Sequence, residues 1–349
     1  MGFAKKALQI LESAGYFELV NRLSRFPYFR PDWDFSLGPA MLIPEVGKAR
    51  DAANFKLAAA AIAMHETEYT AALEDIHKVY VISDHMAQGQ TLINLLTCFS
   101  IRSLAYESLE AISQSSNELI SLDPQVWHFS ILDFWVPSLD LERFSMGGTV
   151  FETMLYDDKA YLDSIFGEDT PRAAIGINWL TRWFFEYDYA AYLNIMFDAR
   201  DQALAHPIHF KELEAAQRAA MKEAGVDHRI LTCMLMPATI SVQSRLYQAE
   251  ARDRLAQTGL ALSNYYWTNK KYPAMLNELV PEFIDKVQID PFSQKPMTYK
   301  RIEDGYALYS IGPDCEDNNG YETTDSKNKQ GDMIWAGRGS KLKREIIEF

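Results

Sequence analysis

The chain has 349 residues and 48% of them are hydrophobic, which is enough for a sizeable core and, at this length, favours two domains. Its formal net charge of −14 argues against a nucleic-acid ligand, because phosphate backbones attract clustered Lys and Arg. Basic residues gather only in the tail, at Lys341, Lys343 and Arg344, where we expect a solvated terminus. The composition therefore predicts no nucleic-acid partner.

The cysteines and the hydropathy pattern further restrict the classes of protein to which the chain could belong. Cys98, Cys233 and Cys315 lie far apart and form no CxxC or Cys/His pattern, so the sequence predicts neither a zinc site nor a disulfide framework. No apolar run approaches the length that spans a bilayer. Attachment to a membrane would therefore need an anchoring segment before Met1.

The first part of the chain, residues 1–228, is predicted to form a large all-α domain. Apolar residues at helical spacing, ended by Phe26-Pro27, indicate a helix over 4–24. Further helices are expected over 45–64, from there to Tyr80, over 90–113 and over 211–224.

The second part, residues 229–349, is predicted to be a smaller α+β domain. A long helix is expected over 230–270, because apolar or small residues follow one helical face. These residues are Leu246, Ala249, Ala256, Leu260, Ser263 and Trp267. Short strands are expected over 297–301 and 306–311, separated by turn residues. The fold class is thus α+β, with a helical domain, a long helix and a small antiparallel sheet that carries an acidic loop.

Several short motifs follow the long helix in a fixed order. They are Tyr272-Pro273, Asp290-Pro291-Phe292, Ser310-Ile-Gly-Pro-Asp314 and Gly331-Asp332-Met-Ile. In this order they resemble the carboxyl-terminal region of the major pseudopilin of type II secretion, a type IV pilin-like protein. The resemblance covers about 230–335. The whole chain also resembles large envelope proteins of planctomycete-type bacteria that end in the same pattern.

The resemblance implies a pilin-like head but not pilin-like assembly. A pseudopilin begins with a hydrophobic helix that inserts in the membrane and polymerises, whereas a helical domain precedes the corresponding segment here. We therefore expect no assembly by the pseudopilin route. The family's setting implies a periplasmic or cell-envelope location and protein partners in the envelope.

The resemblance also implies calcium in the terminal loop, where Asp314 and Asp332 match the family's ligands and Asp317 and Asp325 could add to them. Between Glu303 and Asp332 the chain has eight carboxylates and two lysines. Calcium takes six to eight oxygen ligands from a flexible loop. The alternative is a solvated acidic loop without a metal. An EF-hand is rejected, because asparagine stands at the turn position where glycine is expected.

An enzyme is the less favoured alternative. Asp133, Asp140 and Glu142 lie among Trp127, His128 and Trp135, so the aromatic-rich segment 127–192 could form the cleft of a hydrolase or ligand-binding protein. A filled aromatic core explains the same residues. The clusters His65-Glu66-x-Glu68 and His206-x-x-His209 match no HExxH pattern and are interpreted as surface histidines. The sequence therefore favours a non-catalytic envelope protein with a calcium-stabilised terminal domain.

Overall fold

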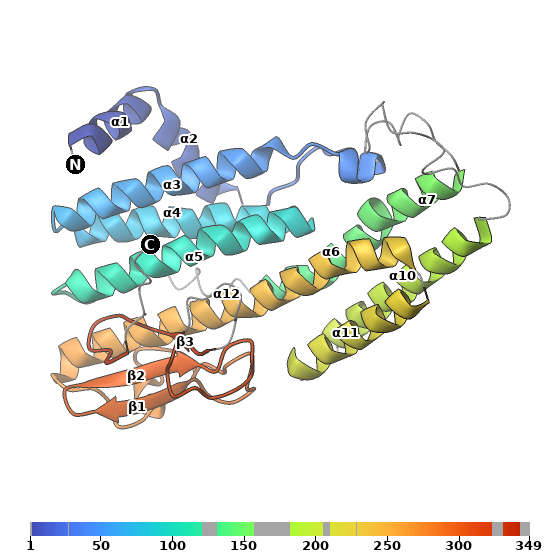
Figure 1. Cartoon of the computed structure of the whole chain (residues 1–349). Coiled ribbons are helices and arrows are strands. Elements are labelled where there is room, and N and C mark those ends of the chain that lie inside the picture. The colour runs from blue at the N-terminus through green and yellow to red at the C-terminus, as the bar shows by residue number, and fades with distance from the viewer. Residues whose placement is uncertain are drawn as a thin grey trace.

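The computed structural model describes residues 2–26, 28–120, 131–156, 182–204, 210–227, 229–322 and 331–342. These residues are mostly helical, with one small sheet near the carboxyl terminus (Figure 1). The α+β class with a large helical part is therefore confirmed. The α-helices are α1 (Gly2–Ser13), α2 (Tyr16–Arg22), α3 (Pro44–His65), α4 (Tyr69–Gln88), α5 (Leu92–Ser115), α6 (Trp135–Leu141), α7 (Gly148–Tyr156), α10 (Arg182–Leu204), α11 (Phe210–Val226) and α12 (Ile230–Asn269).

Shorter elements connect and flank these helices. The 3₁₀ turns are η1 (Leu23–Arg25), η2 (Phe35–Ala40), η4 (Ile131–Phe134) and η6 (Leu276–Leu279), and η5 (Glu142–Gly147) is a π-helix. The strands are β1 (Thr298–Ile302), β2 (Gly305–Ser310) and β3 (Met333–Ile334).

Local signals explain most helix ends. Thr91 caps the start of α5, because its side chain accepts a hydrogen bond from the backbone of Asn94. Lys270 ends α12 in the left-handed conformation, with φ of 58°. The expectation of one helix over 4–24 was wrong. Gly15 adopts φ of 74° and divides the segment into α1 and α2, because glycine enters the left-handed region at little cost.

Helix α12 lies at the centre of the packing, in contact with helices and with the sheet. Helix α5 packs along one side of it, with α4 and α3 beyond, and the sheet covers another side (Figure 1). Helices α10 and α11 also pack against α12. The predicted stripe of α12 is buried, as Leu246 and Leu260 show, but residues off that stripe such as Leu255 are equally buried. The reason is that other segments cover faces that sequence spacing alone leaves open: Trp335, for example, crosses α12 at Gly259, one turn after Leu255.

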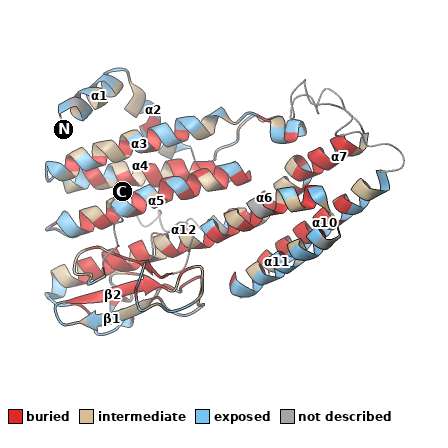
Figure 2. Cartoon of the chain, in the orientation of Figure 1, coloured by how far each residue is buried: buried red, intermediate tan, exposed pale blue. Residues whose placement is uncertain are grey.

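The sheet is antiparallel in the order β1-β2-β3. Leu308 of β2 is paired with Tyr299, and Tyr309 of the same strand is paired with Ile334 of β3. Every residue of β2 is buried, because the strand is central in the sheet and packs on α12. Figure 2 shows this burial continuing from β2 through α12 into α5.

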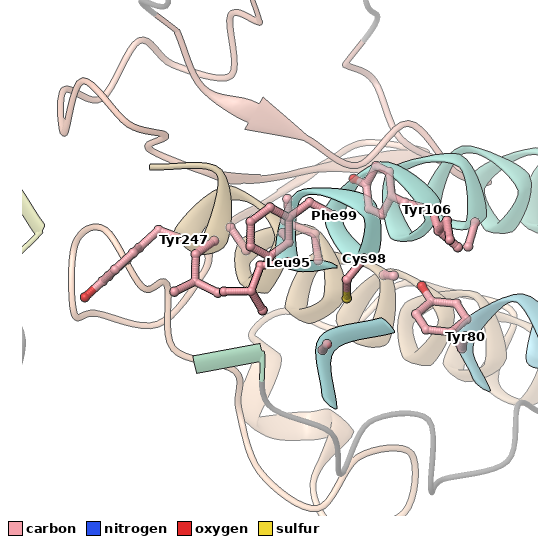
Figure 3. Packing of buried hydrophobic residues seen from close by; sticks show 14 of the residues in the cluster. Tyr80, Leu95, Cys98, Phe99, Tyr106 and Tyr247 are labelled. Carbon is pink, nitrogen blue, oxygen red and sulfur yellow. The ribbon is translucent and has the colours of Figure 1, made fainter. Parts of the chain in front are cut away.

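One contiguous hydrophobic core runs through both predicted domains. Figure 3 shows part of it, where Leu95 and Phe99 of α5 lie close to Tyr247 of α12, and Tyr80 and Cys98 lie beside them. Within the described part of the chain, no helix is both long enough and apolar enough to cross a bilayer.

Candidate functional site

The acidic loop begins where β2 ends, at a turn that only glycine can form. Gly312 has φ of 71°, and a Cβ there would lie 2.3 Å from the carbonyl oxygen of Gly331. The two ends of the loop therefore approach each other closely at this point. The carboxylates that the sequence singled out are held around this crossing.

Asp314 links the two ends of the loop. Its Oδ2 accepts hydrogen bonds from the backbone of Gly331 at 2.9 Å and from the side-chain amide of Asn318 at 3.1 Å. Its Oδ1 accepts from the backbone of Glu316 at 3.1 Å. This carboxylate therefore holds together residues that lie 17 positions apart in the chain.

Asp332 is buried and occupies the other end of the loop. Its two oxygens accept from the backbones of Asn318 at 3.2 Å and Gly320 at 2.5 Å. Burial raises the pKa of Asp332 to about 6, the two backbone donors lower it, and the charges of Asp317 and Asp314 raise it further. The three acids are therefore close enough to repel one another.

Asp317 lies at the exposed edge of the group. Its Oδ1 accepts from the hydroxyl of Tyr309 at 3.0 Å and from the backbone of Asn319 at 2.9 Å. The structure thus brings Asp314, Asp317 and Asp332 into one loop, as the sequence predicted. The fourth predicted ligand, Asp325, lies outside the described residues.

Sequence reasoning did not assign a role to Asp290, which fastens the loop to the body of the sheet. Its Oδ1 accepts from the hydroxyl of Ser310 at 2.7 Å and from the backbone of Phe292 at 3.1 Å, while Oδ2 accepts from the backbone of Ile311 at 3.1 Å. Asp290 is almost fully buried. The signal was present in the Asp290-Pro291-Phe292 motif, because an aspartate before such a turn often bonds to the backbone two residues on.

The loop provides the type of ligand that calcium prefers, since all its donors are oxygens. Most of these oxygens already accept hydrogen bonds from the loop itself. Within the described ranges, no three His, Cys, Asp or Glu side chains are arranged to hold a metal ion. The donor type is one that calcium takes, but Asp314, Asp317 and Asp332 do not form a metal-binding group among the described residues.

A second arrangement joins the terminal segment to α5. The hydroxyl of Tyr106 donates to the carbonyl of Ile334 at 2.7 Å, and the backbone of Ala336 donates to the buried carboxylate of Glu110 at 2.7 Å. Arg338 donates to the carbonyls of Ser113 at 3.3 Å, Gln114 at 3.1 Å and Ser116 at 2.6 Å. A cation at this position stabilises the carboxyl end of a helix, where carbonyls lack intrahelical partners.

Trp335 completes this junction. The side chain is fully buried, and its ring packs edge-on against Tyr106 with centroids 5.5 Å apart. A Cβ on Gly259 would lie 2.2 Å from the indole, so α12 needs glycine at the point where the ring crosses it. No sequence pattern predicted this contact, because it joins three segments that are far apart in the chain.

A third arrangement is an ionic cluster between α4, α5 and α12. The buried guanidinium of Arg102 donates to the carboxylates of Asp84 and Asp253, and its Nε donates to Ser83 at 3.1 Å. Burial raises the pKa of Asp253 to about 6, although the arginine opposes this effect. Two carboxylates share one guanidinium, so the cluster holds these helices together and leaves no group directed at a substrate.

The predicted aromatic cleft receives only partial support. Trp135 is buried, and the partly exposed Asp140 pairs with both Arg143 and Arg200. Burial raises the pKa of Glu142 to about 7. Trp127, His128, His206 and His209 lie outside the described residues.

A separate hollow of about 530 Å³ lies beside this region, and among its described lining residues Phe134 alone comes from the 127–192 segment. The rest of its lining is largely aromatic or polar and comes from other parts of the chain: Tyr28, Phe29, Arg30, Pro31, Phe35, Gln88, Gly89 and Gln90. His65 is exposed, and the neighbouring Glu66 pairs with Lys5.

Comparisons with known proteins give no further assignment. No protein-family model matches the chain, and searches of curated proteins and of solved structures found none that is similar.

Proposed function

We propose that the protein is a non-catalytic structural or interaction protein of the cell envelope, with a rigid, pseudopilin-like terminal head. The observation that supports this proposal most directly is the junction between α5 and the segment 334–338. Tyr106 and Arg338 donate hydrogen bonds across the junction and Glu110 accepts one from Ala336, and together they immobilise the head on the helical body. A rigid head presents its loop in a constant orientation, which suits a protein that binds other proteins.

Calcium binding in the acidic loop is the second part of the proposal. Asp332 is buried near Asp314 and Asp317, and these like charges repel one another unless a cation or a proton offsets them. A cation bound to the native state alone would stabilise it by RT ln(1 + [L]/Kd), about 2.7 kcal/mol at a hundredfold excess over Kd. The loop would then close more firmly against the sheet.

Thermal unfolding in excess calcium and in excess chelator tests the calcium proposal. We expect calcium to raise the melting temperature by several degrees, and Asp314→Ala to abolish the response. Asp304→Asn is the matched control, because Asp304 is an exposed acid of the same sheet, in the turn between β1 and β2. Equal melting temperatures with and without calcium would refute the proposal, as would an unchanged response in Asp314→Ala.

The location is tested separately in cells that produce the protein. We expect the full-length protein to fractionate with the cell envelope and to be cleaved by protease added outside the cytoplasmic membrane. Recovery in the cytoplasmic fraction, protected from protease, would contradict the envelope assignment whether or not calcium binds.

The hollow beside η2 and η4 supports a second candidate function, the binding of a small aromatic anion. Aromatic side chains line it, and among the described lining residues Arg30 supplies a cationic group. The fluorescent sulfonate 1-anilinonaphthalene-8-sulfonate is a suitable probe, and Arg30→Gln should weaken its binding. Equal binding by Arg30→Gln and the parent protein would remove this candidate.

A further inference from the structure

Helix α10 has two opposite faces with different surroundings. Its inner face is buried and includes Asp188, Tyr192, Ile195 and Ala199. Asp188 fixes this face to the start of α12, because its Oδ2 accepts from the backbone of Leu231 at 2.8 Å. The orientation of α10 about its own axis is therefore set by the body of the protein.

The outer face of α10 carries large apolar side chains that are exposed. The exposed fractions are 66% for Trp183, 50% for Tyr187, 45% for Phe197 and 50% for Leu204. Phe144, 64% exposed, extends the same surface, because it and Phe197 lie on either side of the Arg143 guanidinium. Apolar patches of several hundred Å² are uncommon on monomeric proteins and usually mark an interaction site.

The exposed residues follow the spacing of a coiled-coil seam. The seam positions step by four and three residues alternately, and every one is exposed: Trp183, Tyr187, Ala190, Asn194, Phe197, Asp201 and Leu204. This is the heptad pattern in which one helix packs against another along its length. On a helix of 3.6 residues per turn, the seam lies opposite the buried face. The body touches this face at Phe197, which lies against Arg143, and at Tyr187, which lies against Arg229. Both side chains remain about half exposed to a partner helix.

We propose that the outer face of α10 is a homodimer interface, in which the α10 helices of two copies pack antiparallel. This orientation makes the face complementary to itself. Tyr187 of one copy packs against Phe197 of the other, the small Ala190 lies opposite Asn194, and the indole N–H of Trp183 reaches the carboxylate of Asp201. A two-fold axis repeats each contact, as an isologous interface requires.

Charge favours the antiparallel orientation over the parallel one. Beside the seam, Glu186 of one copy lies near Arg200 of the other, and the two-fold axis forms this pair twice. Within each chain Glu186 already pairs with Arg182, and Arg200 with Asp140 and Asp201, at partly exposed positions where a partner can share them. Flanking pairs of this kind set helix orientation in coiled coils. A parallel pair in register would instead place Asp201 opposite Asp201 of the other copy, and like charges repel. The dimer does not depend on calcium or on the loop.

Light scattering coupled to size-exclusion chromatography tests the association. We expect the full chain to approach twice its monomer mass of 39.9 kDa as its concentration rises. Phe197→Asp should return it to the monomer mass with an unchanged circular-dichroism spectrum. Ile93→Asp is the matched control, because Ile93 is a similarly exposed apolar residue of α5. A monomer at every concentration, or a dimer that survives Phe197→Asp, would overturn the proposal.

Cysteine cross-linking tests the orientation. We expect oxidation to join chains carrying Ala190→Cys to chains carrying Asn194→Cys only when the two are mixed, with the unsubstituted protein as background for its three native cysteines. Cross-linking of either variant with itself would overturn the antiparallel arrangement.

Discussion

Carboxylates are buried both between α4, α5 and α12 and in the terminal sheet, but their partners differ. Asp84 and Asp253 are paired with the guanidinium of Arg102. Asp290 and Asp332 instead accept hydrogen bonds mainly from backbone N–H groups. The first arrangement connects three helices, whereas the second draws together segments of the terminal domain: Asp290 bonds to Ile311, 21 residues on, and Asp332 bonds to Asn318, 14 residues back. A buried acid can thus join large elements or organise one loop.

The largest expected effect comes from removing the cation of the ionic cluster. Arg102→Met should lower the free energy of unfolding by about 3–5 kcal/mol, because two buried carboxylates then lose their partner. Denaturant titration measures the change. The triple variant Arg102→Met, Asp84→Asn, Asp253→Asn should recover part of the loss. If the single and triple variants are equally unstable, the cost comes from lost packing and the electrostatic account is wrong.

The next largest loss of stability is expected at Asp290, the buried aspartate that accepts backbone hydrogen bonds and holds the loop to the sheet. Asp290→Ala should lower the free energy of unfolding by about 2–3 kcal/mol, because the buried backbone N–H of Phe292 and the hydroxyl of Ser310 lose their acceptor. Asp285→Ala, at a neighbouring exposed position, should change it by less than about 0.5 kcal/mol. Equal effects of the two substitutions in denaturant titration would show that Asp290 does not hold the loop.

The two regions should respond to pH in the same direction. Asp253 and Asp332 each have a native pKa of about 6, above the value of about 4 for an unfolded chain. Between these values the native state binds more protons than the unfolded state, so stability falls as pH rises from about 4 to about 6 and stays lower above that.

Substitution of Asp332 separates its contribution from that of Asp253. Between about pH 4 and about pH 6 the free energy of unfolding should decrease less in Asp332→Asn than in the parent protein, with a difference of the order of 2 kcal/mol. The decrease that comes from Asp253 should remain. Free energies of unfolding in chelator at several pH values measure this contribution. A pH dependence that is unchanged in Asp332→Asn would show that Asp332 ionises in the native state at an ordinary pKa.

The smallest expected effect comes from the junction of the two regions. Arg338→Ala should lower the free energy of unfolding by about 1 kcal/mol, because a half-exposed cation loses its contacts with the last carbonyls of α5. Arg301→Ala, on the exposed side of β1, is the control and should have little effect. A larger loss in the control than in Arg338→Ala would contradict the assigned role of Arg338.

The sequence by itself determined the local structure. Helical spacing located α3, α5, α11 and α12 to within a few residues of both ends, but it ended α4 at Tyr80, whereas the helix continues to Gln88. It also identified the loop that holds Asp314, Asp317 and Asp332. Asp314 and Asp317 each accept from a backbone N–H two residues on, whereas Asp332 bonds to backbone groups 14 and 12 residues away. The hydrogen bond from Glu316 to Asp314 spans only two residues. Such contacts follow from residue type and turn chemistry, which a sequence contains directly.

Only the tertiary structure decided which helices meet and which surfaces remain open. Arg102 and Asp253 are 151 residues apart, and Arg338 and Ser113 are 225 apart. Helical periodicity predicts that α10 has an apolar face, but it cannot say whether another helix covers that face. Here the body covers the face of Tyr192 and leaves the face of Phe197 exposed. Burial depends on packing between distant segments, and no local pattern encodes it.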